Sequence, residues 1–172
     1  MFDIYKCNKL DSCRFTLGKS GLKKVFVVGL NPSTANKENS DPTVTRVQKV
    51  SENYEYDGFV MLNLYPLRST DPKKLPLQAD TELIKENIAE IVSVVGDESS
   101  PVFWAAWGSD ISSREYLKDA LRQLDAAVEI IGGKWVNYGD LTTKKHPRHP
   151  SRLSYTWGFS DFDMDEYLNI IT

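Results

Sequence analysis

The sequence predicts an α/β fold, a three-layer α/β/α sandwich around a central, mainly parallel sheet of four to five strands. The first observation is a set of short apolar runs, whose continuous rather than alternating apolarity is typical of strands covered on both faces. The second is that segments with helical period lie between these runs, which indicates βαβ units around one sheet. The expected strands span residues 24–30, 58–64, 101–107 and 126–131.

Local start and stop signals place the helices between the strands. Asp41 followed by Pro42 supplies an N-cap and a proline for the first turn, with valines at helical spacing after them. Gly96 favours the end of a later helix, because glycine accepts the positive φ of a helix C-terminus. The expected helices run from Asp41 through Val50, from Asp80 to Gly96 and from about Ser112 to Leu124, with residues 1–20 as a preceding hairpin or irregular cover and 162–171 as a terminal helix.

Composition predicts a single domain spanning residues 1–172. A hydrophobic fraction of 41% is enough to bury a core and excludes a disordered chain. The net charge of −3 argues against a protein that coats nucleic acid, since such proteins are normally strongly basic.

No apolar run approaches the roughly 20 residues of a membrane span, and the N-terminus lacks the pattern of an export signal, so a cytoplasmic protein without membrane contact is expected. Cys7 and Cys13 do not make a disulfide framework.

Polar segments follow the expected strands. In open α/β sheets, ligands bind beyond the carboxyl ends of the strands, so these segments form the expected site. The chain contains neither of the common glycine-rich phosphate loops. The candidate segments are residues 29–34, 63–68 and 107–109, joined by the late segment 146–153.

Two asparagines in these segments are candidates for ligand contacts. Asn31 directly follows a strand and precedes a proline, so it either closes an Asx-type turn or positions a water or a polar ligand. Asn63 interrupts a strongly apolar run, where an amide is unfavourable to bury unless it is hydrogen-bonded. It therefore either bonds the backbone at the strand end or offers the donor and acceptor pair that recognises the edge of a nucleobase.

The two histidines, His146 and His149, are each followed by proline in a stiff, basic loop. Their neighbours are Lys, Arg, Pro and Ser rather than further metal ligands, so no metal site is expected, and a neutral imidazole that stabilises a developing anion fits better. Residues 144–152 carry a local charge of +4 within a chain of −3, so the rest of the chain carries −7. This loop is either an ordinary solvated loop or a phosphate contact at one face.

Four motifs, in this order, resemble those of the uracil-DNA glycosylase superfamily. The first resembles the motif in which an Asp or Asn before proline positions the attacking water, and the second the strand whose Asn hydrogen-bonds the uracil edge. The third is similar to an apolar strand ending in Trp-Gly, and the fourth to a His-Pro-Ser-Pro-Leu-Ser loop followed by an aromatic-Gly-Phe stretch. Here the motifs are Gly29-Leu-Asn31-Pro32-Ser33, Val60-Met-Leu-Asn63-Leu, Val102 through Ser109, and His149 through Ser154 with Trp157-Gly158-Phe159.

The sequence also resembles a narrower, uncharacterised family of prokaryotic and phage proteins. That family carries Leu-Asn-Pro-Ser-Thr-Ala, Asp-Pro-Thr with an Arg, Asn-Leu followed by Arg-x-Thr-Asp-Pro, Ala-Trp-Gly and Arg-His-Pro. This resemblance is the more specific of the two, and it identifies related proteins but implies no activity. The corresponding segments are Leu30–Ala35, Asp41–Arg46, Asn63–Pro72, Ala106–Gly108 and Arg148–Pro150.

The superfamily resemblance implies a uracil-DNA glycosylase-like fold and a set of residue roles. Asn31 would orient a water against the sugar C1′, His149 would hydrogen-bond the departing base, and Asn63 would select the base. The resemblance implies no metal and no organic cofactor. The implied base pocket also contains Pro32, Ser33, Trp107 and Gly108, while Arg148, Ser151 and Arg152 would contact DNA phosphates and Leu153 would wedge into the space of the flipped nucleotide.

Three residues depart from the superfamily pattern. Asn31 stands where the most active members have Asp, Ser33 where the most selective have a Tyr that blocks thymine, and Arg152 where the loop usually has a second Pro. The expected function is a glycosylase-like nucleobase pocket that hydrolyses an N-glycosidic bond in DNA. A non-catalytic module that binds a nucleotide or nucleic acid, and a hydrolase acting on free nucleosides or nucleotides, are the alternatives.

Overall fold

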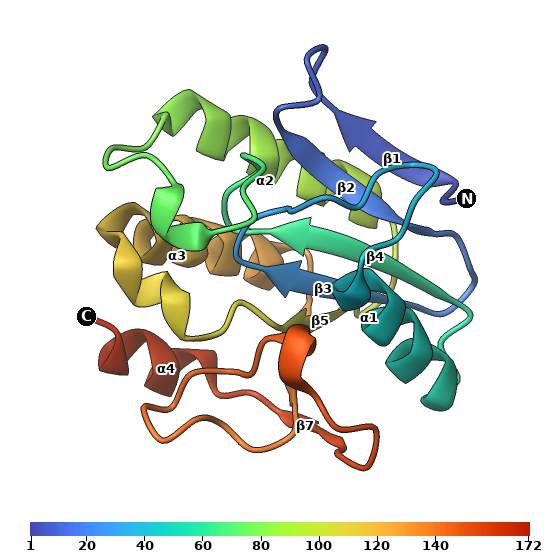
Figure 1. Ribbon diagram of the computed structural model, residues 1–172. Helices are drawn as coiled ribbons and strands as arrows, with labels where there is room; N and C mark the ends of the chain where they lie inside the picture. The colour runs from blue at the N-terminus through green and yellow to red at the C-terminus, as the bar shows by residue number, and fades with distance from the viewer.

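A computed structural model describes residues 1–172 and shows one mixed sheet with helices around it (Figure 1). Its strands are β1 (Ile4–Cys7), β2 (Arg14–Lys19), β3 (Lys24–Gly29), β4 (Gly58–Asn63), β5 (Val102–Ala105), β6 (Lys134–Tyr138) and β7 (Phe159–Asp161). They lie in the order β1-β2-β4-β3-β5-β6-β7. The central strands β4, β3, β5 and β6 are parallel, whereas β1, β2 and β7 are antiparallel to their neighbours.

The α/β class is confirmed, but the sheet has seven strands rather than the expected four to five. The additional strands extend both sides of the parallel centre. The outermost strands, β1 and β7, carry mostly partly buried or exposed side chains. They therefore lack the continuous apolar pattern by which the central strands can be predicted.

Three of the four α-helices join strands of the sheet and the fourth follows β7, and two expected signals act as helix caps. Oδ1 of Asp41 accepts a hydrogen bond from the backbone N–H of Val44 at 2.9 Å, and Gly96 ends the second helix with a φ of 58°. No helix combines the length and the apolar character needed to cross a bilayer. The helices are α1 (Pro42–Asn53), α2 (Thr81–Val95), α3 (Glu115–Ile130) and α4 (Met164–Ile170).

The two faces of the sheet carry separate apolar cores. On one face, α2, α3 and α4 pack over alternate residues of the central strands, among them Leu62 and Phe103. On the other face, α1 packs over the intervening residues, among them Val27 and Met61. Helices therefore cover both faces of the sheet, as a three-layer sandwich requires.

One of the expected strands is wrong. Residues 126–131 form the last turns of α3 and the residue after it, and the strand in this region is β6. Within that run only Val128 is fully buried, and Ile130 is 85% exposed. Val128 continues the helical spacing of Leu121 and Leu124, so tertiary packing of one helix face outweighs the β-branched composition of the run.

The parallel centre of the sheet brings distant loops to one edge. In the order β4-β3-β5, Gly29 pairs with Asn63 and Val28 with Ala105, so these strands end at nearly the same level. Three short 3-10 turns follow in the loops beyond this edge and in the late segment. They are η1 (Pro72–Lys74), η2 (Ser109–Ser113) and η3 (Pro150–Arg152).

Candidate functional site

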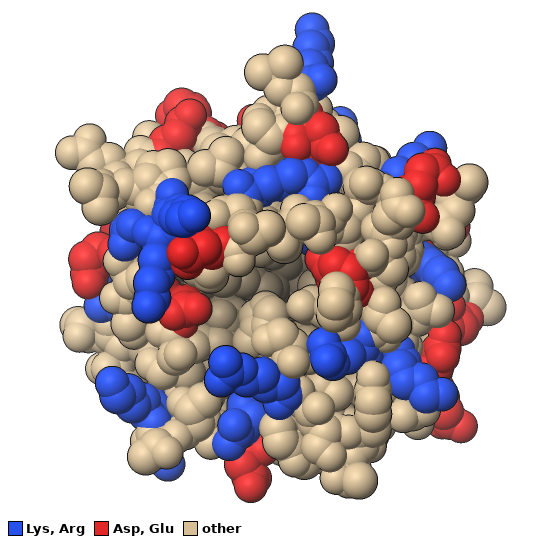
Figure 2. Space-filling view, in the orientation of Figure 1, with Lys and Arg blue, Asp and Glu red and all other residues tan.

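A cleft of about 720 Å³ opens beyond the carboxyl ends of β3, β4 and β5. Figure 2 shows it as the hollow near the centre of the view, with charged side chains around it. Only 2 of its 17 lining residues are hydrophobic, so the cleft suits a polar ligand. Among the residues expected at the site, those that line the cleft are Asn31, Ser33, Trp107, Gly108, Arg148, His149, Ser151 and Arg152.

A smaller space of about 60 Å³, the inner cavity, adjoins the cleft. The cleft and the inner cavity share four lining residues, which are Asn31, Ser33, Thr43 and His149. Asn63 lines the inner cavity and is 2% exposed. The structure therefore gathers Asn31, Asn63 and His149 around adjoining spaces, although they follow three different parts of the chain.

The side chain of Asn31 fastens two loops of the cleft together. Its Nδ2 donates hydrogen bonds to the carbonyl of Ser69 at 2.9 Å and to the carbonyl of Pro32 at 3.1 Å. Its Oδ1 accepts no hydrogen bond from the protein, and the residue is only partly buried. The amide nitrogen thus closes the loop structure, while the amide oxygen is free to accept from a water or a ligand.

Asn63 ends β4 with a side chain that the protein leaves unsatisfied. Its backbone carbonyl accepts a hydrogen bond from Nδ2 of Asn87 on α2 at 2.8 Å. Its own Nδ2 is buried and has no partner, so the side chain does not bond the backbone in the way that a structural amide would. Gly29 makes room for this amide, because a Cβ there would lie 3.1 Å from Oδ1 of Asn63. An unpartnered buried donor costs about 1–3 kcal/mol, which favours an acceptor in the inner cavity.

The hydrogen bonds of His149 select one tautomer of its neutral imidazole. The backbone N–H of Ser151 donates to Nδ1 at 3.1 Å, and the Ser151 hydroxyl lies 2.8 Å from the same atom. A nitrogen that accepts the backbone N–H carries no proton, so the proton of the neutral ring is on Nε2. Burial lowers the pKa of His149, against the opposing fields of Asp110 and Asp41. Nε2–H makes no hydrogen bond to the protein and is available as a neutral donor.

Gly108 permits the close approach of the loop that carries His149. Its φ of 72° and ψ of −167° fall in a region that is nearly restricted to glycine. A Cβ at this position would lie 3.2 Å from the Cβ of His149. The absence of a side chain at Gly108 therefore lets the backbone of the His149 loop lie close to the segment after β5.

His146 does not line the cleft. It is 6% exposed, and its Nδ1 lies 2.8 Å from Oη of Tyr167 on α4. Nε1 of Trp107 donates to the same hydroxyl at 3.0 Å, so one hydroxyl contacts both His146 and Trp107. The two histidines, three residues apart, therefore differ in role: His146 anchors the loop and His149 faces the cleft.

The basic loop contributes two arginines to the cleft, and the protein holds the guanidinium of only one of them. Arg152 is exposed at the end of η3, and its guanidinium has no hydrogen-bond partner in the protein. Arg148 donates from Nε to the carbonyl of Asp140 at 2.7 Å, and its guanidinium lies 5.1 Å from the centre of the Trp157 ring. Arg152 is thus the cation at the cleft whose guanidinium the protein does not hold.

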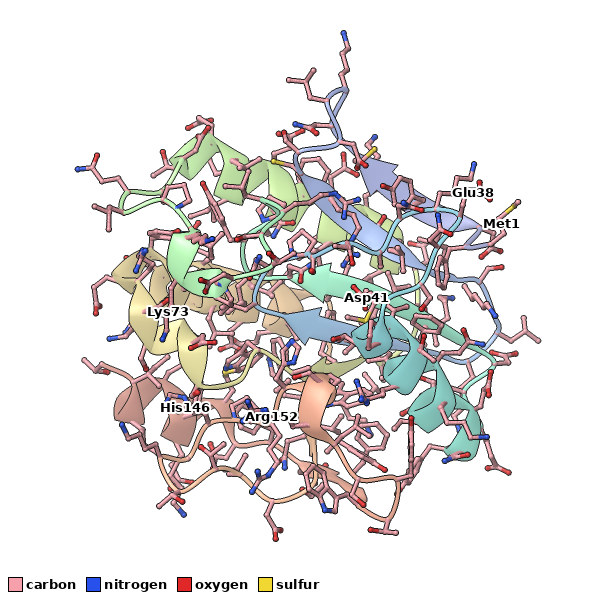
Figure 3. The ribbon with its side chains drawn as sticks, in the orientation of Figure 1. Met1, Glu38, Asp41, Lys73, His146 and Arg152 are labelled. Carbon is pink, nitrogen blue, oxygen red and sulfur yellow. The ribbon has the colours of Figure 1, made fainter.

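Acidic residues also border the cleft, so its charge is mixed. Asp110 lines the cleft, and Asp41 lines the inner cavity while it caps α1. Figure 3 shows Asp41, Lys73 and Arg152 on three different sides of the opening. No group of three or more His, Cys, Asp and Glu side chains is arranged to hold a metal ion.

Two expected site residues lie outside the lining of both spaces. Pro32 is buried, and its carbonyl accepts hydrogen bonds from Nδ2 of Asn31 and from the backbone N–H of Ser69. Leu153 packs, partly buried, against the core on the α1 face of the sheet. In this structure Pro32 supports the cleft from behind, and Leu153 is part of the packing rather than a free wedge.

Sequence reasoning missed Arg14 and the second role of Asp41. Both line the inner cavity, and Arg14 is 2% exposed on β2. An isolated charge within the apolar stretch 13–17 is the one signal that could have indicated Arg14. Asp41 gave no such signal, because its capping role already explains it.

Arg68 fixes the loop that carries Ser33. Its Nη1 donates to the carbonyls of Ser33 at 2.7 Å and Ala35 at 2.9 Å. Its Nη2 donates to Oδ1 of Asp11 at 2.9 Å and to Oη of Tyr5 at 2.9 Å. This arginine therefore ties one wall of the cleft to the β1–β2 hairpin.

A family model described as "Protein of unknown function (DUF1643)" matches residues 14–151. The matched range includes every residue that lines the inner cavity, and every residue that lines the cleft apart from Arg152. No curated protein and no solved structure matches the chain. None of these comparisons links it to the uracil-DNA glycosylase superfamily.

Proposed function

Because the chain belongs to the DUF1643 family, whose function is unknown, we propose a function from the residues of the cleft alone. The protein binds a nucleobase-containing ligand and hydrolyses the N-glycosidic bond of that ligand. The observation that carries this proposal is that Asn31, Asn63 and His149 line adjoining spaces. Each offers a neutral polar atom that the protein does not use. Such atoms suit an uncharged, planar base, while Arg152 at the rim suits a phosphate.

In the proposed reaction, Oδ1 of Asn31 accepts a hydrogen bond from a water and holds it toward C1′ of the sugar. The water oxygen bonds to C1′ as the C1′–N bond breaks, and the electron pair of that bond stays on the base nitrogen. Nε2–H of His149 donates to the base as negative charge develops on it. The base takes up the proton that the water has lost. An amide orients the water without removing its proton, so we expect slow turnover.

We also propose that the fold is uracil-DNA glycosylase-like. The four motifs that resemble this superfamily fall at the ends of β3, β4 and β5 and in the loop that carries His149. Ligands of open α/β sheets bind at such strand ends, so the shared order of motifs has a structural reason.

The mixed charge of the cleft supports a second candidate substrate, a free nucleoside or nucleotide. Asp110 and Asp41 lie close enough to His149 to oppose the lowering of its pKa. Acids in these positions would repel the successive phosphates of a polynucleotide more strongly than the single phosphate of a mononucleotide.

The test is release of free base, measured by chromatography after long incubation with the full chain. The substrates are single- and double-stranded oligonucleotides carrying uracil, hypoxanthine or other damaged bases, and free nucleosides and nucleotides. We expect release from at least one substrate, and its loss in His149→Ala. Lys145→Ala is the matched control, since it changes the same loop at a residue that does not line the cleft. Saturable binding without release would overturn the hydrolase and leave a binding module, and no binding at low salt would overturn both.

A further inference from the structure

Arg14 is a buried arginine whose charge the protein leaves without an ion pair. It lies at the start of β2 and is 2% exposed. Nη1 donates to the carbonyl of Ala35 at 3.1 Å, but Nε is buried without a partner, and no acceptor of the protein bonds Nη2. One complete edge of the guanidinium is therefore unused.

An unpaired charge in the interior is strongly unfavourable, so its retention calls for an explanation. Burial, assisted by the neighbouring Arg68, lowers the pKa of Arg14 to about 10. The side chain thus remains charged at neutral pH. No nearby carboxylate takes the unused edge, which leaves a ligand or solvent as its acceptor.

The inner cavity is where such an acceptor would lie. Arg14 lines it together with Asn63, whose Nδ2 is likewise buried and unpartnered. The Nε–Nη2 edge presents two parallel donors, which match two adjacent acceptor atoms. At about 60 Å³ the inner cavity has room for the edge of a ring, and the adjoining cleft has room for the rest of a nucleotide.

The negative charge of Asp41 favours a neutral base edge over an anion as the ligand of the inner cavity. Its carboxylate also lines the inner cavity, and its field raises the pKa of Arg14, which shows that the two charges interact. A phosphate or carboxylate entering this space would meet the negative charge of Asp41. A neutral ring with two adjacent acceptors would meet no such opposition.

Among the nucleobases, guanine presents that pair of acceptors, as O6 and N7. Adenine presents N7 beside an amino donor, and thymine and uracil present one carbonyl on the same edge. We propose that Arg14 recognises the O6–N7 edge of a guanine-type base in the inner cavity, with Nδ2 of Asn63 as a further donor to that edge. This inference rests on the base pocket of the proposed function and adds the class of base that the pocket takes.

The test measures the affinity of the full chain, by titration calorimetry at low salt, for GMP, IMP, AMP, UMP and 7-deaza-GMP. GMP and IMP carry both acceptors, whereas 7-deaza-GMP lacks N7 and keeps the rest of the molecule. We expect GMP and IMP to bind about tenfold or more tightly than AMP and UMP, and 7-deaza-GMP to lose a comparable factor. The deaza comparison uses the unaltered protein and does not depend on any variant folding.

Arg14→Gln is expected to bring the affinity for GMP down to that for AMP, with folding checked by circular dichroism. Arg46→Gln on α1 is the control, since Arg46 lines neither space. Equal affinities for all five nucleotides would overturn the inference and leave the proposed function standing. Binding of inorganic phosphate that disappears in Arg14→Gln would also overturn it, because the inner cavity would then be an anion site. Absence of binding by every nucleotide would overturn this inference, whereas the proposed function is decided separately by the base-release assay with oligonucleotides.

Discussion

Oη of Tyr167 lies 2.8 Å from Nδ1 of His146, and the same hydroxyl accepts a hydrogen bond from Nε1 of Trp107. One hydroxyl on α4 thereby joins the end of β5 to the loop that carries His149. The loop that carries His149 is therefore anchored at His146 by α4, although that helix does not line the cleft.

Tyr167→Phe removes this hydroxyl and leaves two buried ring nitrogens without a partner. We expect the free energy of unfolding to fall by about 2–4 kcal/mol, as measured by chemical denaturation. Tyr155→Phe serves as the control, because Tyr155 is 50% exposed and makes no side-chain hydrogen bond in the protein. Equal stability of the two variants would show that the hydroxyl does not hold the loop.

The stability of the protein should decrease as the pH falls below neutrality. Burial lowers the pKa of both His146 and His149 from the ordinary value of 6.5. Below pH 6.5 the unfolded chain therefore binds more protons than the native one, so the free energy of unfolding falls as the pH decreases through this value. Denaturation series between about pH 7.5 and 5.5 measure the slope. His149→Asn should flatten it, and an unchanged slope in that variant would contradict the assignment.

Gly108→Ala should affect both stability and the site. A side chain there meets a strained backbone region, which costs about 1–3 kcal/mol, and its Cβ would lie 3.2 Å from the Cβ of His149. Gly132→Ala is the partner control, since Gly132 also has a positive φ, of 69°, with nothing within 4 Å of the added Cβ. Thermal unfolding should show a loss in both variants, whereas ligand binding should fall in Gly108→Ala alone. A fall in both would mean that the contact with His149 is not the cause.

Asn31→Asp tests the structural part of the role of Asn31. The substitution replaces the Nδ2 donor by a carboxylate oxygen that faces the carbonyls of Ser69 and Pro32. We expect the free energy of unfolding to decrease by about 1–3 kcal/mol, and by more than in Asn31→Ala, because the carboxylate adds repulsion. If Asn31→Asp is as stable as the native protein, the two loops are not held by this amide.

Arg152→Gln should weaken the binding of phosphate-bearing ligands at low salt. Arg152 is exposed at the cleft and free of protein partners, so its expected contact is with a phosphate. The slope of log affinity against log salt for an oligonucleotide should fall by about one. Lys145→Gln, in the same loop but outside the cleft, should leave the slope unchanged. A change of equal size in both variants would indicate a diffuse field rather than a local contact.

The rule for strand ends predicts that Asn31 and Asn63 lie at one edge of the sheet, because it depends only on the order of elements, whereas His149 is expected beside them from the superfamily resemblance. The sequence does not predict Arg14, whose one side-chain hydrogen bond reaches Ala35, 21 residues away in the loop that follows β3. It also misplaces the end of α3, where Val128 looks like a strand residue by composition and packs as a helix residue. Both failures occur where contacts distant in sequence outweigh local preference.

The contacts of Arg68 draw on residues outside the range that the family model matches. Tyr5 and Asp11, which hold this arginine, precede residue 14, where the match to the family model begins. The anchor of one cleft wall thus comes from outside the matched range, whereas the wall itself comes from inside it. A substitution of Tyr5 or Asp11 therefore changes how firmly this wall is held without altering any residue that lines the cleft.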